Sequence, residues 1–204
     1  MKLLPKILLA GVMTMAALVL SVRAATARVG QPAPDFTLTG LDGQRHALAD
    51  FKGKTVVLEW VNPDCPFVKK HYDSQNMQHT QRAAAAAGVV WLLINSAAAG
   101  KEGDYAPAAA AKWLKETGAA ATAYLRDPDG AVGHLYDART TPHLFIVNPA
   151  GVLVYAGGID NIRSTKIDDI AKATNYVKAA LADLAAGRPV ATATSQPYGC
   201  SVKY

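Results

Sequence analysis

The sequence predicts one α/β domain with a central mixed sheet flanked by helices, preceded by a short apolar leader. Two observations lead to this fold class. Apolar runs of strand length alternate with segments of helical composition between residues 55 and 136. Two further apolar runs, joined by a short turn, then precede a helix with an apolar face. Roughly 177 residues follow the leader, enough for a single hydrophobic core.

Residues 1–27 have the layout of a secretory signal peptide. Lys2 and Lys6 precede an uncharged run at 7–20, and small residues follow it. That run is too short for a comfortable membrane span. Cleavage after Ala27 or Ala24 would leave a mature chain in the periplasm, or another extracytoplasmic compartment, with no membrane attachment. An uncleaved anchor is the alternative.

The charge balance argues against nucleic acid as a partner. The leader carries Lys2, Lys6 and Arg23 among the 21 basic residues and none of the 16 acidic ones, so the mature chain is close to neutral. Its sequence holds no basic block and no basic patch interleaved with aromatic residues. Export would place Cys65 and Cys200 where disulfides form and persist.

The first half of the domain is built around two apolar strands. FTLTG and QRHAL flank the turn LDGQ and predict a β-hairpin. TVVLEWV, at 55–61, is a buried strand by its β-branched and aromatic content, and Pro66 suits the first turn of a helix that runs to about Ala87. VVWLLINS, at 89–96, is the next strand, and a glycine-containing loop leads to a helix around AAAAKWLKE.

The second half closes the sheet and ends in a tail. A short strand near TAYLRD and a short helix to Tyr136 precede HLFIVN and VLVYAG, which predict an antiparallel hairpin. The last helix carries an apolar face from Ile170 to Leu184 and ends at Gly187. The domain therefore spans 28–187. The tail at 188–204, which carries Cys200, has no helical or strand periodicity.

Cys65 lies in NPDCPFVKK, where the first central strand gives way to its helix. The free N–H groups and the dipole at a helix N-terminus favour negative charge, and therefore the nucleophilic thiolate. The alternative is an inert buried cysteine, because free cysteines are among the most buried residues.

The order βα, βα, ββα, with a cysteine at the first strand-to-helix junction, is the thioredoxin arrangement. Over residues 29–204 the chain resembles the redoxin and alkyl-hydroperoxide-reductase/thiol-specific-antioxidant group, in its peroxiredoxin-like branch. The resemblance lies in three segments: VGQPAPDFTLTG, LEWVNPDCPFVKKHY and the terminal PYGCSVKY. The resemblance implies a thiol oxidoreductase that acts on protein or small-molecule disulfides or on hydroperoxides. It also implies an external thiol reductant and no organic cofactor.

Two departures from the related motifs determine how Cys65 would work. Thioredoxins place a second cysteine three residues on, where this chain has Val68; typical peroxiredoxins carry a proline and a threonine where it has Leu58 and Asn62. Cys65 therefore needs a partner elsewhere, and Cys200 is the candidate resolving residue. A permanent structural bridge between the two cysteines, or a bridge from Cys200 to another chain, are the alternatives.

Glu59 is the single charge in the otherwise apolar strand TVVLEWV. It stands six residues before Cys65, where thioredoxins keep a buried acid that handles protons. Burial would raise the pKa of its carboxyl toward neutral pH and suit it to proton transfer. A partly solvated carboxylate, or one paired with a lysine, is the alternative.

The segment TTPHLFIV adds substrate-binding candidates. By the resemblance, Pro142 is the cis-proline opposite Cys65, and Thr141 supplies backbone groups that dock an extended substrate strand. Pro66 and Phe67, next to the sulfur, complete this set.

A binding or metal-delivery module is the second hypothesis, with Cys65 as a ligand or in a static disulfide. His71, His79 and His143 are its candidate ligands, together with Cys65 and Met77. His71 stands six positions after Cys65 and so does not share its helical face. Surface histidines are therefore the preferred interpretation, and the sequence predicts no metal site.

Overall fold

A computed structural model describes residues 26–204. The predicted signal peptide lies almost entirely outside the described residues. Within 26–204, no helix is both long and apolar enough to cross a membrane.

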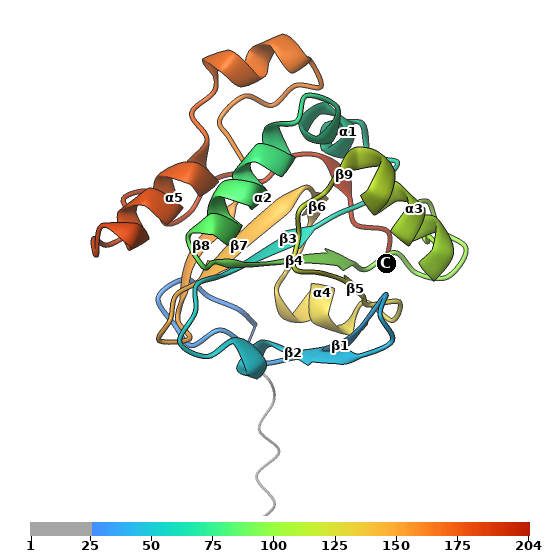
Figure 1. The fold of residues 1–204 in the computed structure, drawn as a ribbon, viewed down its shortest axis with the longest axis horizontal. Coiled ribbons are helices and arrows are strands. Elements are labelled where there is room, and N and C mark those ends of the chain that lie inside the picture. Colours follow the sequence, from blue (N-terminus) through green and yellow to red (C-terminus); the bar gives the residue numbers. More distant parts are fainter. Residues whose placement is uncertain (1–25) are drawn as a thin grey trace, which may run out of the picture.

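A seven-stranded mixed sheet in the order β2-β1-β5-β4-β3-β7-β8 forms the centre of the protein (Figure 1). Its parallel strands β3, β4 and β5 lie side by side, and β7 runs antiparallel to β3. This confirms the α/β class and the thioredoxin-like arrangement. The strands are β1 (Thr37–Gly40), β2 (Arg45–Ala47), β3 (Val56–Trp60), β4 (Val90–Asn95), β5 (Ala123–Arg126), β6 (Thr140–Thr141), β7 (His143–Val147), β8 (Leu153–Gly157) and β9 (Cys200–Ser201).

Helices cover both faces of the sheet, as Figure 1 shows. Side chains of α1, α2, α3 and α5 pack on one face, and α4 with η1 packs on the other. The helices are α1 (Pro66–Asp73), α2 (Asn76–Ala86), α3 (Pro107–Thr117), α4 (Ala131–Leu135) and α5 (Tyr176–Ala185), with two 3-10 helices, η1 (Leu48–Phe51) and η2 (Ile167–Lys172).

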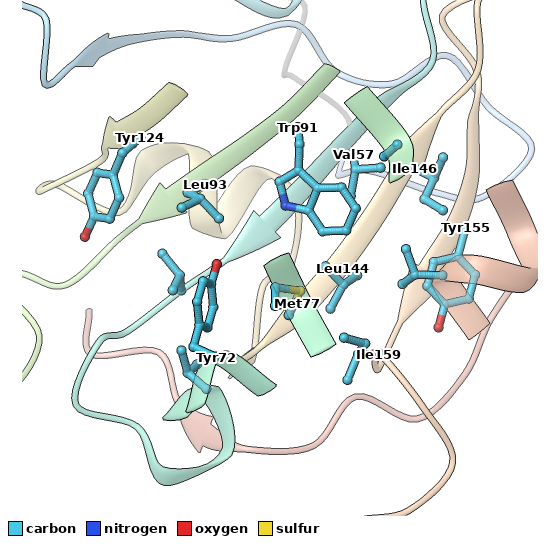
Figure 2. Close-up of a cluster of buried hydrophobic side chains, with 14 of the residues drawn as sticks. Val57, Tyr72, Met77, Trp91, Leu93, Tyr124, Leu144, Ile146, Tyr155 and Ile159 are labelled. Carbon is cyan, nitrogen blue, oxygen red and sulfur yellow. The ribbon is translucent and has the colours of Figure 1, made fainter. Parts of the chain in front are cut away.

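Strand β3 is buried along its whole length because both faces of the sheet are covered. Val57 points into the cluster drawn in Figure 2, where strand residues meet Tyr72 of α1 and Met77 of α2. Leu58 and Trp60 face the opposite cluster, beneath α4. Glu59 shares the face of Val57, so it lies on the side of the sheet that also holds Cys65.

The structure corrects two predicted helices. The helix expected from Pro66 to about Ala87 is divided in two, because Gln75 adopts a left-handed conformation at φ 62° between α1 and α2. The last helix begins at Tyr176, so Ile170 belongs to the separate helix η2. The other predicted elements lie within a few residues of their expected positions.

The tail is more ordered than its sequence suggests. Its end, residues 193–204, runs from β8 past β6 to the segment that follows β4, and we call it the strap. Within the strap, β9 pairs antiparallel with β6, so that Cys200 opposes Thr141. On either side, the amide of Ala156 donates to the carbonyl of Ala193, and the amide of Val202 donates to Arg139. The tail, whose sequence has no strand periodicity, thus contributes a strand of two residues.

Gly199 lets the strap approach β6 closely. Its φ is 141°, and a Cβ there would overlap the carbonyl oxygen of Thr141. We expect Gly199→Ala to detach the strap, because the backbone of β6 cannot yield to a new methyl group. The backbone amide of Val202, protected by its bond to Arg139, should then exchange hydrogen at least about tenfold faster in exchange measurements.

Gly187→Ala is the matched control. Gly187 has a φ of 67°, but a Cβ there meets nothing within 4 Å. Gly187→Ala therefore places an alanine at a positive φ without the overlap, and it should leave the protection of Val202 unchanged. Equal exchange of Val202 in both variants would contradict the proposed close approach.

Candidate active site

Cys65 occupies the N-cap position of α1, as predicted. Pro66 takes the first helical position, where its missing N–H costs nothing. The turn before the helix is held by Asn62, whose carbonyl accepts from the amide of Cys65 at 3.1 Å and whose side-chain oxygen accepts from the amide of Asp64 at 2.9 Å. The side chain of Cys65 is completely buried.

Thr141 brings the two cysteines together. The Sγ of Cys65 donates to the carbonyl oxygen of Thr141 at 3.0 Å. The same residue is the register partner of Cys200 across the β6–β9 pair. Both cysteines are free thiols, and Cys200 is partly exposed where Cys65 is not. The only two cysteines of the chain, distant in sequence, thus meet at one backbone position.

The electrostatics of the pair are asymmetric. Burial raises the pKa of the Cys200 thiol to about 12, and a hydrogen bond to Cys65 and the charge of Cys65 add to the rise. Cys200 is therefore protonated at neutral pH. The proton held on Cys200 suits Cys65, rather than Cys200, to attack first.

Glu59 is completely buried among three side-chain donors. The indole Nε1 of Trp91 donates to its carboxylate at 2.7 Å, the hydroxyl of Tyr72 at 3.1 Å and the Nε2 of Gln81 at 3.3 Å. Burial nevertheless dominates these bonds and raises the pKa of Glu59 to about 7. The burial expected from the sequence is present. The hydrogen bonds link Glu59 to α1, α2 and β4, and none joins it to Cys65.

The predicted substrate-binding residues surround Cys65, but the edge they offer is occupied. The Thr141–Pro142 peptide is cis, as expected. Pro66 is exposed. The ring of Phe67 packs edge-on against the ring of Tyr198 in the strap, with 5.8 Å between the ring centroids. The backbone of Thr141, expected to dock a substrate strand, pairs instead with the chain's own Cys200. A substrate strand would have to displace the strap to use it.

The histidines are placed differently from the expectation. His71 and His143 are buried, so the surface interpretation was wrong for both, and His79 is exposed. Burial lowers the pKa of each buried imidazole to about 4. Asn76 is hydrogen-bonded to the Nδ1 of His71 at 2.9 Å, and the amide of Arg139 donates to His143. Among residues 26–204, no group of three or more histidine, cysteine or acidic side chains is arranged to hold a metal ion.

Sequence reasoning missed Asp160, which lies beside the site in the loop after β8. Asp160 is buried and accepts a hydrogen bond from the hydroxyl of Tyr198. Its Oδ2 lies 3.8 Å from the Nε2 of His71, which has no hydrogen-bond partner in the described part of the chain. An isolated aspartate in GGID carries no motif that could have identified it.

The fold and the site define a class: a redoxin of the thioredoxin-like superfamily, with its cysteine at the N-terminus of α1 and a cis-proline opposite. Residues 29–156 match the AhpC/TSA family, and the chain belongs to that family, whose members are typically thiol oxidoreductases. Among curated proteins, none matches the sequence closely enough to mark a relative.

Solved structures agree with this class. An uncharacterized conserved protein from Geobacillus kaustophilus is similar with a TM-score of 0.72 and 30% identity, covering 87% of this chain and 92% of its own. A hypothetical protein from Sinorhizobium meliloti has a TM-score of 0.73 at 24% identity over 88% and 96%. A putative thiol:disulfide interchange protein from Chlorobium tepidum has a TM-score of 0.51 at 26% identity over 64% and 85%.

The raised pKa of Glu59 makes stability depend on pH. The folded protein keeps the proton of Glu59 up to about pH 7, whereas the unfolded chain releases it near pH 4.5, so stability from this group is lost as pH rises through that window. Relative to Glu59→Gln, the free energy of unfolding of the wild type should fall by roughly 3 kcal/mol across it.

Denaturant unfolding of both proteins at a series of pH values measures this difference. Other titrating groups, His71 and His143 among them, are common to both proteins and cancel in the comparison. Parallel stability curves between pH 4.5 and 7 would mean that Glu59 has an ordinary pKa.

Proposed function

We propose that this protein is an exported thiol–disulfide oxidoreductase in which Cys65 attacks the substrate and Cys200 resolves the intermediate. The single observation that carries the proposal is the meeting of both cysteines at Thr141, which accepts from Cys65 and pairs with Cys200. Membership of the AhpC/TSA family supports the chemistry. The signal-peptide layout of residues 1–27 supports export.

The first step is attack by Cys65 on a substrate disulfide. The Cys65 thiolate bonds to one sulfur, the substrate's S–S bond breaks, and one substrate thiolate leaves. The N-terminus of α1 favours the thiolate of Cys65. The S–H of Cys200, held protonated by its raised pKa, donates to the same sulfur.

The second step transfers the bond to Cys200. Once Cys65 is part of a mixed disulfide it carries no charge, so its contribution to the high pKa of Cys200 disappears. Cys200 attacks the sulfur of Cys65 and passes its proton to the departing substrate sulfur, so that the second substrate thiol leaves. The substrate is reduced to two thiols and the protein is oxidised to a Cys65–Cys200 disulfide. An external thiol reductant then restores the two thiols.

Reduction of hydroperoxides is the second candidate, favoured by the family match. Cys65 would attack the peroxide oxygen to give a sulfenic acid and an alcohol, and Cys200 would condense with it to give the disulfide and water. The positions occupied by Leu58 and Asn62 lack the proline and threonine of typical peroxiredoxins. Disulfide exchange is therefore the primary proposal, and turnover of a protein disulfide against hydrogen peroxide decides between them.

Replacement of each cysteine separates their roles. Cys65→Ser should abolish turnover. Cys200→Ser should still complete the first step and accumulate a mixed disulfide at Cys65, because no second thiol remains in the chain to resolve it. Mass spectrometry of the unreduced protein after one turnover should find that adduct.

Two results would contradict this division. Wild-type protein in which Cys65 and Cys200 stay separate thiols after mild oxidation would exclude the resolving role. A Cys65–Cys200 disulfide with a reduction potential below about −300 mV would identify a permanent structural bridge.

Glu59 is proposed to hold the proton that the exchange takes up or releases. With its pKa at about 7, it changes protonation in the working pH range. Glu59→Gln should slow exchange at neutral pH severalfold and remove an inflection near pH 7 from the pH–rate profile. Superimposable profiles for variant and wild type would leave Glu59 with the structural role of joining α1, α2 and β4.

A further inference from the structure

Tyr198 lies two residues before Cys200 and is the most deeply buried aromatic residue of the strap, with 2% of its surface exposed. Its hydroxyl donates to the Oδ1 of Asp160, and its ring packs edge-on against Phe67 at the start of α1. One side chain thus ties the strap both to the loop after β8 and to the helix that carries Cys65.

Asp160 is a rigid acceptor. The backbone amide of Ile162 donates to the same Oδ1 at 2.9 Å, and Asp160 bridges to Asn175 through the backbone. Only 2% of Asp160 is exposed. A buried carboxylate is costly unless its oxygens are bonded, so the hydroxyl of Tyr198 is one of the few groups that satisfy it.

Gly199, between Tyr198 and Cys200, helps to fix where the sulfur of Cys200 lies. Because a Cβ at Gly199 would overlap Thr141, the backbone passes from Tyr198 to Cys200 in close contact with β6. Beyond Cys200 the strap is fixed again, since the amide of Ala98 donates to the carbonyl of Lys203 at 2.8 Å. Cys200 is therefore held on both sides: Tyr198 is bonded to Asp160 two residues before it, and Val202 is bonded to Arg139 two residues after it.

From these contacts we propose that Tyr198 and Asp160 are positioning residues for the resolving step: their hydrogen bond holds Cys200 beside Cys65 and closes the strap over the buried sulfur. The inference rests on the proposed function, because it assigns the pair a role only in bringing Cys200 to an intermediate on Cys65. Neither side chain needs to touch the substrate.

The two steps should respond to loss of this bond in opposite directions. Cys65 is completely buried, so a looser strap exposes it and speeds its reaction with an external disulfide. The same loosening lowers the effective concentration of Cys200 near Cys65 and slows the second step. General destabilisation would change both rates in the same directions, but it would do so equally in a variant that loses a buried hydrogen bond elsewhere in the fold. Comparison with such a variant therefore separates the two explanations.

Dithiobisnitrobenzoate tests this inference on the reduced full-length protein. Attack by Cys65 breaks the reagent's S–S bond and releases one coloured thiolate; attack by Cys200 on the mixed disulfide releases the second. Two electrons pass from the two thiols to the reagent. Stopped-flow absorbance at limiting reagent follows both releases, so each step gives its own rate.

Tyr198→Phe removes only the hydroxyl. The ratio of the second rate to the first should fall at least about tenfold, as expected for loss of a hydrogen bond to a charged group. Asp160→Asn should lower it less, because the amide oxygen still accepts. Tyr136→Phe is the matched control: its hydroxyl, also buried, donates to Pro34 at 2.6 Å on the opposite face of the sheet.

The outcomes separate the two proposals. A wild-type protein that releases a single equivalent would overturn the resolving role of Cys200 itself. Two equivalents from the wild type, with Tyr198→Phe unchanged in both rates, would overturn the positioning role and leave the function standing. An equal fall in the rate ratio for Tyr136→Phe would also overturn it, since that pattern indicates general destabilisation of the fold.

Discussion

The backbone of Thr141 serves both cysteines at once. Its carbonyl oxygen accepts from the Sγ of Cys65, and its strand pairs with that of Cys200. A thioredoxin-like site normally leaves such an edge open to a partner's extended chain, and here the chain's own strap fills it. The geometry explains how a protein with Val68 in place of a local second cysteine brings its two sulfurs together.

Helix α1 is held on two sides by buried acids, in addition to its apolar contacts. On the side of α1 that faces the sheet, the hydroxyl of Tyr72 donates to Glu59 of β3. On the side that faces the strap, the imidazole of His71 lies next to the carboxylate of Asp160. Cys65 stands at the start of the same helix. The two acids differ in their surroundings: Glu59 has only side-chain donors, whereas Asp160 also binds a backbone amide. Movements of α1 would therefore disturb the cysteine and both acids together.

The sequence predicted the sheet and the place of Cys65 at the start of α1 well, because both depend on local patterns: apolar runs of strand length, and a cysteine before proline. It failed where partners are remote or the signal is weak. The break at Gln75 is marked by neither glycine nor proline. Asp160, the acidic neighbour of His71, is distant in the chain. A strand of two residues such as β9 has no period to detect. The resemblance to redoxins, rather than periodicity, indicated the cis-proline.

For the disulfide proposed between Cys65 and Cys200, the unequal exposure of the two sulfurs implies a direction of reaction. Cys65 is sealed beneath the strap, whereas Cys200 presents part of its surface to solvent. In that proposed reaction a reducing thiol from outside would meet Cys200 first, and Cys65 would be the leaving group. Electrons would enter through Cys200 and leave through Cys65, so the reductant and the substrate would not need to share a binding site.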